Sequence, residues 1–283
     1  MQRGDFAAAW KLCDDFLQSR LRSGVSQHSQ PRHLQHVWNG MPVDGKRVLV
    51  RCYHGLGDTL MFARLLSMLR RCAREVIVWA QPNLLELLRT VEGIDRLLPL
   101  HSGAPDADYD IDVELMELPH LLRLSAVPDR VPYLHVAPVA TMSAISLRRV
   151  GIVWQSGVWD WTRSIAPRLL APLAQASGVH WFSLQYGGGE LAFAATDLAC
   201  RDILEQARRL HALDLVISVD TMMAHLAGAF GLPVWLLLPT PCDWRWMLER
   251  DDSPWYPTMR IFRQPQPGDW KSVVDSVLRA LNS

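Results

Sequence analysis

Hydrophobic positions along the chain follow two patterns that alternate: continuous β-branched runs and longer stretches with helical spacing. Residues 47–52 (RVLVRC) and 75–80 (EVIVWA) are apolar runs typical of strands buried on both faces of a sheet. Because strands that alternate with helices pair in parallel, the first half of the chain is predicted to form a parallel sheet covered by helices. The other elements predicted in this half are short strands at 95–100 and 109–114 and helices at 59–72, 82–91 and 115–125.

The same alternation begins again near residue 149. Apolar runs such as 214–220 (DLVISVD) and 233–239 (PVWLLLP) predict buried strands, with a helix between them at 221–230 (TMMAHLAGAF). This half is therefore also predicted to be a parallel α/β unit. Its remaining predicted strands are 149–157, 180–189 and 259–264, and its remaining predicted helices are 202–213 and 269–281.

The fold class predicted from these patterns is α/β, with two Rossmann-like, doubly wound domains and a short helical extension before them. The extension and its polar linker are assigned to residues 1–40, the N-terminal domain to 41–144 and the C-terminal domain to 145–283. The extension contains one helix at residues 5–22, whose apolar face we expect to pack on the domain that follows. That face consists of Phe6, Trp10, Cys13, Phe16 and Leu17.

Composition narrows the class of protein. The chain has 29 Lys and Arg against 29 Asp and Glu, so no nucleic-acid patch or polybasic membrane anchor is expected. Its five cysteines are scattered and form no C-x-x-C pair, which favours a reducing compartment without disulfides or a zinc site. No secretory signal and no run of about 20 apolar residues is found, so we expect a cytoplasmic protein without an integral membrane segment. A peripheral contact with the inner membrane is left open.

In open α/β sheets, ligands bind beyond the carboxyl ends of the strands. The first polar cluster at such an end is YHGLGD, which supplies His54, Gly55, Gly57 and Asp58. The glycines allow a tight turn, and Asp58 is predicted either to cap the following helix or to act as a general base toward a hydroxyl. The dinucleotide fingerprint G-x-G-x-x-G and the P-loop lysine are both absent from this turn, which disfavours nicotinamide binding and ATP hydrolysis.

A second cluster follows the predicted strand at 214–220. The first amides of the next helix favour an anion, and Thr221 adds a hydroxyl group. His225 lies one helical turn further on. The alternative interpretation is structural: Asp220 caps the helix, and His225 is hydrogen-bonded in the packing between the domains.

The polar segments VWQSG and SLQYGGGE, which follow two neighbouring predicted strands, support a phosphate site. Arg163 could grip a diphosphate in bidentate fashion, although a solvated arginine in a loop is the commoner case. The aromatic residues between Trp244 and Tyr256 are expected to fix a loop to the core rather than to form a pocket. The other candidate residues for donor binding are Gln155, Ser156, Gly157, Gln185, Gly187 and Glu190.

Taken together, the segments HGLGDTL, GIVWQSG, RSI, SLQYG and SVDTMMAHLAGAFGLPVWLLLP resemble the ADP-heptose glycosyltransferase family. The branch attached to bacterial tetratricopeptide repeats is the most similar one, and the N-terminal GDFAAAW is similar to the remnant of a terminal helical repeat. The resemblance spans residues 40–283. It implies a GT-B fold, in which two Rossmann-like domains face each other across a cleft.

The resemblance also implies an inverting, metal-independent transfer of a sugar from a nucleotide donor. Asp58 matches the proposed base of that family, and Arg163 lies where a basic residue meets phosphate. The sequence departs from the lipopolysaccharide heptosyltransferases at two positions: Met222 stands in place of a glycine, and Arg163 in place of a lysine. The residues that match the nucleotide-diphosphate loop are Asp220, Thr221, Met222 and His225.

The function predicted from these observations is a cell-envelope or protein glycosyltransferase, with a glycan, a lipid-linked glycan or a protein as acceptor. No cofactor is expected besides the nucleotide-sugar co-substrate, for which ADP-heptose is the candidate. A protein partner could bind through the N-terminal helix. Two alternatives are left open: a non-catalytic module for nucleotide-sugar binding or assembly, and a nucleotide-sugar epimerase.

Overall fold

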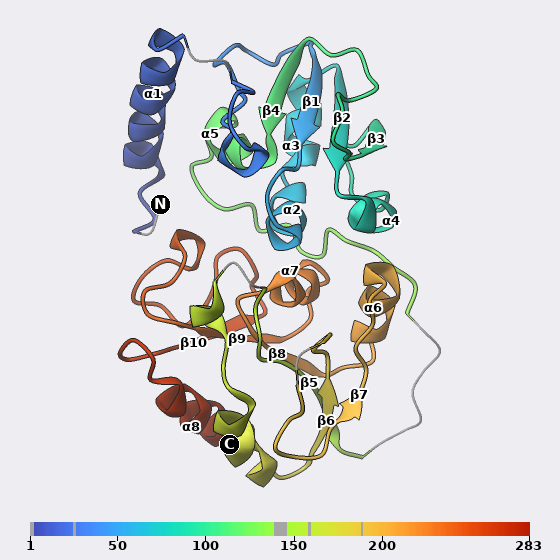
Figure 1. The fold of residues 1–283 in the computed structure, drawn as a ribbon, viewed down its shortest axis with the longest axis vertical. Coiled ribbons are helices and arrows are strands. Elements are labelled where there is room, and N and C mark those ends of the chain that lie inside the picture. Colours follow the sequence, from blue (N-terminus) through green and yellow to red (C-terminus); the bar gives the residue numbers. More distant parts are fainter. Residues whose placement is uncertain (1–2, 25–26, 139–145, 158–159, 188) are drawn as a thin grey trace. The chain divides into compact units, whose positions relative to one another are not determined.

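The computed structural model describes residues 3–24, 27–138, 146–157, 160–187 and 189–283. The chain divides into two compact units, Met1–His135 and Val136–Ser283, each built around its own sheet (Figure 1). The boundary predicted between residues 144 and 145 lies outside the described residues.

Unit 1 contains a four-stranded parallel sheet in the order β3-β2-β1-β4. All four strands lie where the apolar runs predicted them. The chain passes from β1 to β2 and β3 on one side and then crosses over to place β4 on the other side of β1. The point where the strand order reverses is therefore between β1 and β4. The strand bounds are Arg47–Arg51 (β1), Glu75–Ala80 (β2), Arg96–Pro99 (β3) and Ile111–Glu114 (β4).

Both faces of the central strand β1 are buried. Successive side chains of a strand point to opposite faces, and Leu49 lies in register with Ile77 of β2 on one of them. There the two residues form a small core cluster with Trp79. Val48 and Val50 point to the opposite face and are also fully buried. Burial on both faces explains why this run is continuously apolar instead of alternating.

The predicted helix at 59–72 is two helices, because a buried arginine interrupts it. Arg64 is 3% exposed, and its Nε donates to the Met61 carbonyl at 3.0 Å. This bond occupies the carbonyl that a continuous helix would pair with Leu65, whose N–H donates to Phe62 instead. The helices of unit 1 that follow the first strand are α2 (Leu56–Ala63), α3 (Leu66–Cys72), α4 (Leu85–Leu88) and α5 (Leu118–Leu121).

The N-terminal helix α1 (Phe6–Arg22) packs on the rest of unit 1, as the sequence predicted. Its Trp10 indole N–H donates to the Leu124 carbonyl at 2.7 Å, and Asp14 forms ion pairs with His120 and Arg123. Phe6, Trp10 and Leu17 are buried, but Phe16 is 52% exposed and packs edge-on against His36. The prediction that Phe16 belongs to the buried face is therefore wrong, because only part of that face is covered.

Unit 2 contains a six-stranded parallel sheet in the order β10-β9-β8-β5-β6-β7. From β5 the chain moves outward to β6 and β7, and then returns to place β8 on the other side of β5. The order therefore reverses between β5 and β8. The strand bounds are Arg148–Val153 (β5), Val179–Ser183 (β6), Thr196–Asp197 (β7), Leu215–Val219 (β8), Val234–Leu238 (β9) and Met259–Arg263 (β10).

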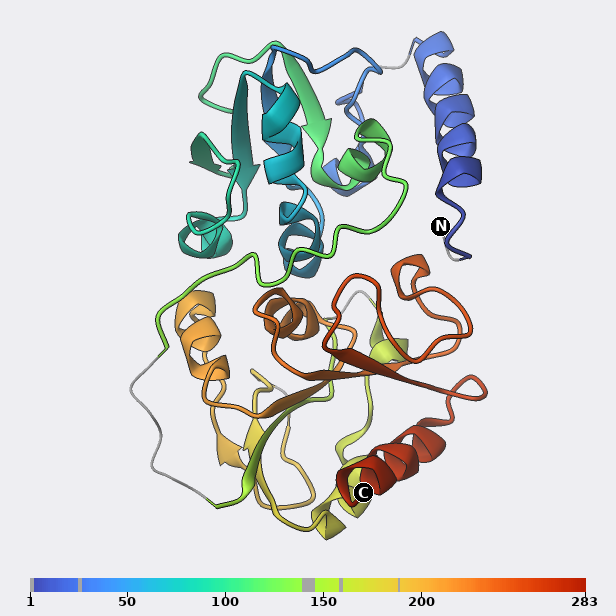
Figure 2. The ribbon, with the colours of Figure 1, turned by 180° about the vertical axis from the view of Figure 1, so that it is seen from behind.

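The helices of unit 2 follow the predicted pattern. Helix α8 packs along a 3-10 segment, Pro167–Gln175, and both contribute to the core on that face of the sheet (Figure 2). The strand predicted at 180–189 ends at Ser183, and the chain then turns through Gly187 and Gly189, which have positive φ angles. The helices are α6 (Ile203–Leu210), α7 (Met222–Ala229) and α8 (Trp270–Leu281).

Within the described residues, the structure contains no helix that is both long enough and apolar enough to cross a membrane.

Candidate functional site

The point of strand reversal in unit 2 brings the loops after β5 and β8 together. Asp220 follows β8 directly and is only 4% exposed. Its Oδ2 lies 3.7 Å from Nη1 of Arg163, in the loop after β5. Its Oδ1 lies 3.7 Å from Nε2 of His225, on α7. Three residues that the sequence singled out are thus in one cluster, at the edge of the sheet where α/β proteins bind ligands.

The environment of Asp220 keeps its carboxyl ionised. Burial by itself raises the pKa of Asp220, but the interaction with His225 and the charge of Arg245 outweigh it and lower the pKa to about 2. A buried, ionised carboxylate between cationic groups is a fixed electrostatic element, because it needs no rearrangement when a ligand arrives.

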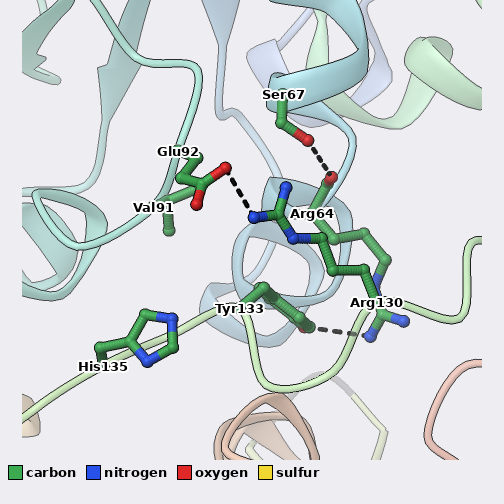
Figure 3. A pocket seen from close by; sticks show the side chains of 7 residues that line it. All are labelled: Arg64, Ser67, Val91, Glu92, Arg130, Tyr133 and His135. Atoms are coloured by element: carbon green, nitrogen blue, oxygen red, sulfur yellow. Dashed lines mark hydrogen bonds and ion pairs between the residues drawn. The ribbon is translucent and has the colours of Figure 1, made fainter.

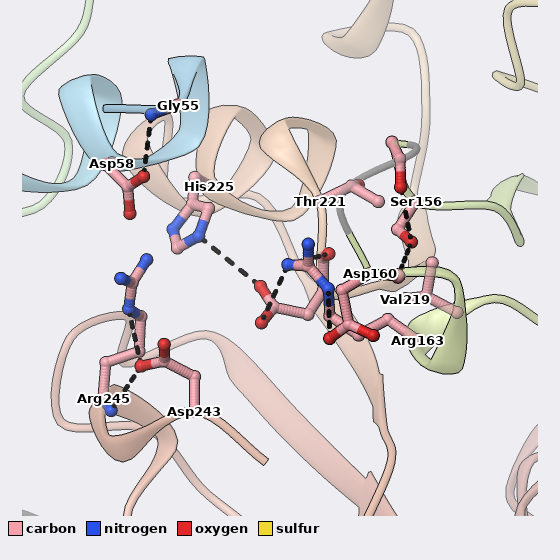
Figure 4. A network of polar contacts seen from close by, with 12 residues as sticks. Gly55, Asp58, Ser156, Asp160, Arg163, Val219, Thr221, His225, Asp243 and Arg245 are labelled. Carbon is pink, nitrogen blue, oxygen red and sulfur yellow. Dashed lines mark hydrogen bonds and ion pairs between the residues drawn. The ribbon is translucent and has the colours of Figure 1, made fainter. Parts of the chain in front are cut away.

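Arg163 is held by more than one group. Its Nη1 donates to the Asp220 carbonyl at 3.2 Å, and its Nε lies 3.4 Å from the Asp160 carboxylate (Figure 4). The solvated-loop interpretation is therefore wrong for this arginine, whose side chain is 29% exposed. Two carboxylates fix its position, and the exposed part of the guanidinium is what an anion could reach.

His225 is buried within α7 and has partners on both ring nitrogens. Nδ1 lies 2.9 Å from the Tyr256 hydroxyl, and the ring stacks on Trp246 at a centroid distance of 5.3 Å. The residue is 1% exposed. His225 therefore pairs with Asp220 from within the core. The aromatic residues Trp246 and Tyr256 fix the loop to the core, as the sequence predicted.

Gly228 of α7 leaves room for the Tyr256 ring, and this close contact gives a test of the support beneath His225. A Cβ atom at position 228 would lie 2.6 Å from Cδ1 of Tyr256. We expect Gly228→Ala to lower the free energy of unfolding by about 1–3 kcal/mol, as overpacking in a core does, and to weaken nucleotide binding because His225 loses its partner. Urea denaturation measures the first effect.

The matched control for Gly228→Ala is the double variant with Tyr256→Leu, in which the clashing ring is absent. The two changes should then be strongly non-additive. Simple additivity of the two free energies would show that Gly228 and Tyr256 are not coupled.

The structure does not bear out the alternative in which Asp220 caps α7. The N-cap residue is Thr221, with extended backbone angles, and not Asp220, whose carboxylate points to His225 and Arg163 instead. The Thr221 hydroxyl lies 3.1 Å from the Ser218 hydroxyl. Met222 occupies the first helical position and is half-buried. The Thr221 side chain makes no capping hydrogen bond to the first N–H groups of α7. These N–H groups therefore keep the capacity to bind an anion.

The polar residues after β5 hold their own loop. Gln185 Oε1 accepts from the backbone N–H of Gln155 at 2.9 Å and of Trp154 at 3.2 Å. The Ser156 hydroxyl donates to the Asp160 carbonyl at 2.6 Å. Gln185 therefore stabilises the backbone beyond β5.

The glycine-rich segment after β6 does not join this cluster. Gly187 adopts φ +71°, which favours glycine, and Gly157 and Glu190 are exposed. Within the described residues, Glu190 has no part in the hydrogen-bond network of Asp220. A role of Glu190 in donor binding stays a prediction.

The turn after β1 lies at the point of strand reversal in unit 1. Gly55 is the N-cap of α2 and Asp58 its third residue, so Asp58 caps the helix as the third residue of a capping box and not as the N-cap itself. Asp58 Oδ2 accepts from the Gly55 N–H at 2.9 Å, and the carboxylate is half-buried (Figure 4). Gly57 lies inside the first turn of α2 and not in the loop. A backbone donor therefore holds one oxygen of Asp58 at the turn that follows β1.

The chain matches no protein-family model. It is 28% identical over 291 aligned residues to Protein FlbA of Caulobacter vibrioides, and the match covers 86% of this chain. The chain spans about half the length (48%) of that relative.

Solved structures give a clearer result for the fold. The glycosyl transferase family 9 structure from Veillonella parvula superposes with a TM-score of 0.58 at 12% identity, covering 85% of this chain and 97% of that one. Escherichia coli heptosyltransferase WaaC with ADP-2-deoxy-2-fluoro heptose gives a TM-score of 0.56 at 13% identity, covering 84% and 100%. TibC in complex with ADP-D-beta-D-heptose gives 0.54 at 12% identity, covering 85% and 78%.

This chain shares the fold of those glycosyltransferases. The prediction of an α/β fold with two parallel sheets is thereby confirmed.

Within this glycosyltransferase fold, sequence reasoning missed residues on both units. Glu114, at the end of β4, is 1% exposed and contacts the turn that carries Asp58. Arg245 is 8% exposed, lies 2.9 Å from Asp243, and its charge acts on Asp220. Glu114 is a carboxylate between Val113 and Leu115 at the end of a predicted strand, and Arg245 lies between two tryptophans. Their charge inside such segments was the available signal, since buried charges need partners.

A small cavity in unit 1 lies beside Arg64 and Tyr133, and it is too small for a sugar (Figure 3). Its volume is about 20 Å³, which is close to the space of a single water. The Arg64 guanidinium lies over the Tyr133 ring at 4.5 Å and donates to its hydroxyl at 3.1 Å. The Arg130–Glu92 ion pair, at 2.6 Å, closes one side. The cavity is therefore a packing feature of the α2–α3 break.

Within the described residues, no group of three or more His, Cys, Asp or Glu side chains is arranged to hold a metal ion. The five cysteines are free thiols.

Proposed function

We propose that this protein is a glycosyltransferase that moves a sugar from a nucleotide-diphosphate donor to a hydroxyl group of a glycan, a lipid-linked glycan or a protein. The observation that carries the proposal is the buried cluster of Asp220, Arg163 and His225 at the strand reversal of unit 2. The fold shared with the family 9 glycosyltransferases supports it. The reaction we propose inverts the anomeric centre and needs no metal.

On the donor side, the diphosphate is proposed to bind at the N-terminus of α7. The N–H groups of Met222 and its neighbours supply the positive end of the helix dipole. Arg163 is close enough to Asp220 to add a cationic group to the same place. Charge that builds up on the leaving diphosphate is stabilised by these preorganised groups. Asp220 orients the site and does not contact phosphate, because a carboxylate repels it.

On the acceptor side, Asp58 is proposed to remove the proton from the attacking hydroxyl group. The hydrogen bond from the Gly55 N–H to one of its oxygens gives this half-buried carboxylate a fixed orientation, which a general base needs. ADP-heptose is the proposed donor, because the TibC and WaaC structures are described with ADP-heptose or its 2-fluoro analogue. Membership of the branch attached to tetratricopeptide repeats is part of this proposal.

Isothermal titration calorimetry with ADP, UDP, GDP and CDP tests donor binding directly. Of the four, we expect ADP to bind, with a dissociation constant of about 1 μM to 1 mM, the range of Michaelis constants of ordinary enzyme substrates. Incubation with ADP-heptose and candidate acceptors should then release ADP only when an acceptor is present. Release of a changed sugar nucleotide without any acceptor would contradict transfer and favour an epimerase.

A second candidate is a nucleotide-sugar-binding or assembly module without catalysis. The commitment of Arg163 to two carboxylates favours it, because an arginine so occupied contributes less to a diphosphate. This module would bind no nucleoside diphosphate, or would bind one without turnover at any acceptor. The calorimetry and the ADP-release assay therefore separate the two functions.

A further inference from the structure

A buried carboxyl lies beneath the turn that carries Asp58. Glu114 ends β4, which pairs with β1 in register Arg51↔Glu114, at the strand reversal of unit 1. The residue is 1% exposed. Its Oε1 accepts from the Tyr53 N–H at 3.2 Å, and its Oε2 accepts from the Met116 N–H at 2.6 Å. A side chain 61 residues away in sequence thus holds the first residue of the turn.

The Glu114 carboxyl also lies close to the imidazole of His54. Oε1 of Glu114 lies 3.2 Å from Nδ1 of His54, whose side chain is 26% exposed while that of Glu114 is 2% exposed. The contact has the distance of an ion pair without the angles of a hydrogen bond, and it places a titratable ring that reaches partly to the surface beside a buried acid. His54 lies one residue before Gly55, the residue that fixes Asp58.

A second side chain holds the turn from the other neighbour of β1. Gln81, just after β2, donates to the His54 carbonyl at 2.8 Å and accepts from the Thr59 hydroxyl at 3.0 Å. The turn is therefore clamped on both sides, by a titratable group from β4 and by a neutral amide beyond β2. This asymmetry provides a matched comparison, since either clamp can be removed alone.

We propose that Glu114 and His54 form a pair that shares one proton and positions the turn bearing Asp58, so that the pair sets the alkaline limit of the proposed transfer reaction. The inference has two halves: the pair itself, and its effect on the transfer rate, which we call the kinetic half. Only the kinetic half rests on the proposed function, because the pair exists independently of any substrate. Glu114 is a positioning residue in this scheme, acting through His54 and the turn.

The charges around Glu114 support the sharing of a proton. Burial, together with the negative charges of Glu117 and Asp58, raises the pKa of Glu114 to about 8, although the backbone N–H donors of Met116 and Tyr53 act to lower it. Among the described residues, the buried Cys52 thiol also lies close to Glu114, and Glu117 itself lies 4.0 Å from His36.

Loss of the shared proton changes the electrostatics of the turn. Below pH 8 the pair is neutral or positive, and above pH 8 a net negative charge is buried beside Asp58 and Glu117. Like charges in a poorly solvated place repel. Ionised Glu114 still accepts from the N–H groups of Tyr53 and Met116, but its repulsion displaces the Asp58 carboxylate, and the transfer rate falls.

The first experiment needs no activity. The imidazole resonances of His54 are followed against pH by NMR, in the native protein and in Glu114→Gln, Glu117→Gln and Gln81→Leu. We expect Glu114→Gln to move the titration of the His54 ring to lower pH, because the ring loses a partner that holds a proton with it. Glu117→Gln and Gln81→Leu should move it much less. An unchanged titration in Glu114→Gln would overturn the pair.

The second experiment is the pH dependence of ADP release with donor and acceptor present. The native rate should fall about tenfold between pH 7 and pH 9, as expected for loss of one proton near pH 8. In Glu114→Gln this alkaline fall should disappear, while Gln81→Leu lowers the rate equally at every pH. An even loss in Glu114→Gln would overturn the kinetic half. Absence of transfer in the native protein overturns the proposed function instead, and the NMR titration still decides the pair.

Discussion

Replacing Asp58 by asparagine is expected to lower the rate of sugar transfer by about 10²- to 10⁴-fold, the usual contribution of a positioned general base. An amide has no basic oxygen that can accept the proton of the acceptor hydroxyl. The binding of nucleoside diphosphate should stay unchanged, because the proposed donor site lies in the other unit. The measurement is ADP release at saturating donor and acceptor, together with calorimetry.

The fold of the Asp58→Asn variant should be preserved for a local reason. The asparagine oxygen can still accept from the Gly55 N–H, which Asp58 Oδ2 accepts at 2.9 Å in the native protein. Glu86→Gln, on α4, is the matched control, because it removes an exposed carboxylate whose partner is Arg89. Near-native turnover in a folded Asp58→Asn variant would exclude Asp58 as the base.

Asp220→Ala is expected to have the largest effect on stability. The change leaves buried His225 and partly exposed Arg163 without their shared carboxylate, and the cost is bounded by the about 3–5 kcal/mol of breaking a fully buried ion pair. Nucleotide binding should be lost with it, because Asp220 orients Arg163. The free energy of unfolding from urea denaturation measures the first effect, and calorimetry measures the second.

Asp214→Ala is the control for Asp220→Ala. Asp214 lies at the other end of β8, forms a 2.7 Å ion pair with Arg149, and is 39% exposed. Ion pairs of this kind contribute at most about 1 kcal/mol. If Asp220→Ala does not fold, Asp220→Asn preserves the shape and removes only the charge. A loss from Asp220→Asn no larger than that from Asp214→Ala would contradict the electrostatic role of Asp220.

The pKa of Asp220 also predicts how the free energy of unfolding depends on pH in acid. The pKa of Asp220 is about 2 in the folded protein, below the ordinary value of 3.8. Its stabilising contribution is therefore fully present above pH 3.8 and is lost as pH falls from 3.8 toward 2, because the unfolded chain binds the proton first. The slope of stability against pH in this window should be shallower in Asp220→Asn than in the native protein.

The strands of both sheets could be read from the sequence because burial on both faces demands continuous apolar runs. RVLVRC and DLVISVD each became a central strand, β1 and β8, with neighbours on both sides. Thr196–Asp197, the edge strand β7, was not predicted, because an exposed strand of two residues has no apolar pattern to detect. The interruption between α2 and α3 was equally hidden, since it depends on the burial of Arg64 by residues far along the chain.

The sequence by itself determined the fold class, the alternation of strands and helices, and the polar residues that follow the strands. These are local properties, because hydrophobic spacing and turn chemistry act over a few residues. The tertiary structure alone decided which strand ends are neighbours. Only the reversal of strand order places Arg163 against Asp220, 57 residues later, and Glu114 against the turn of Asp58. Contacts of that range follow from the order of strands in a sheet, which no local pattern encodes.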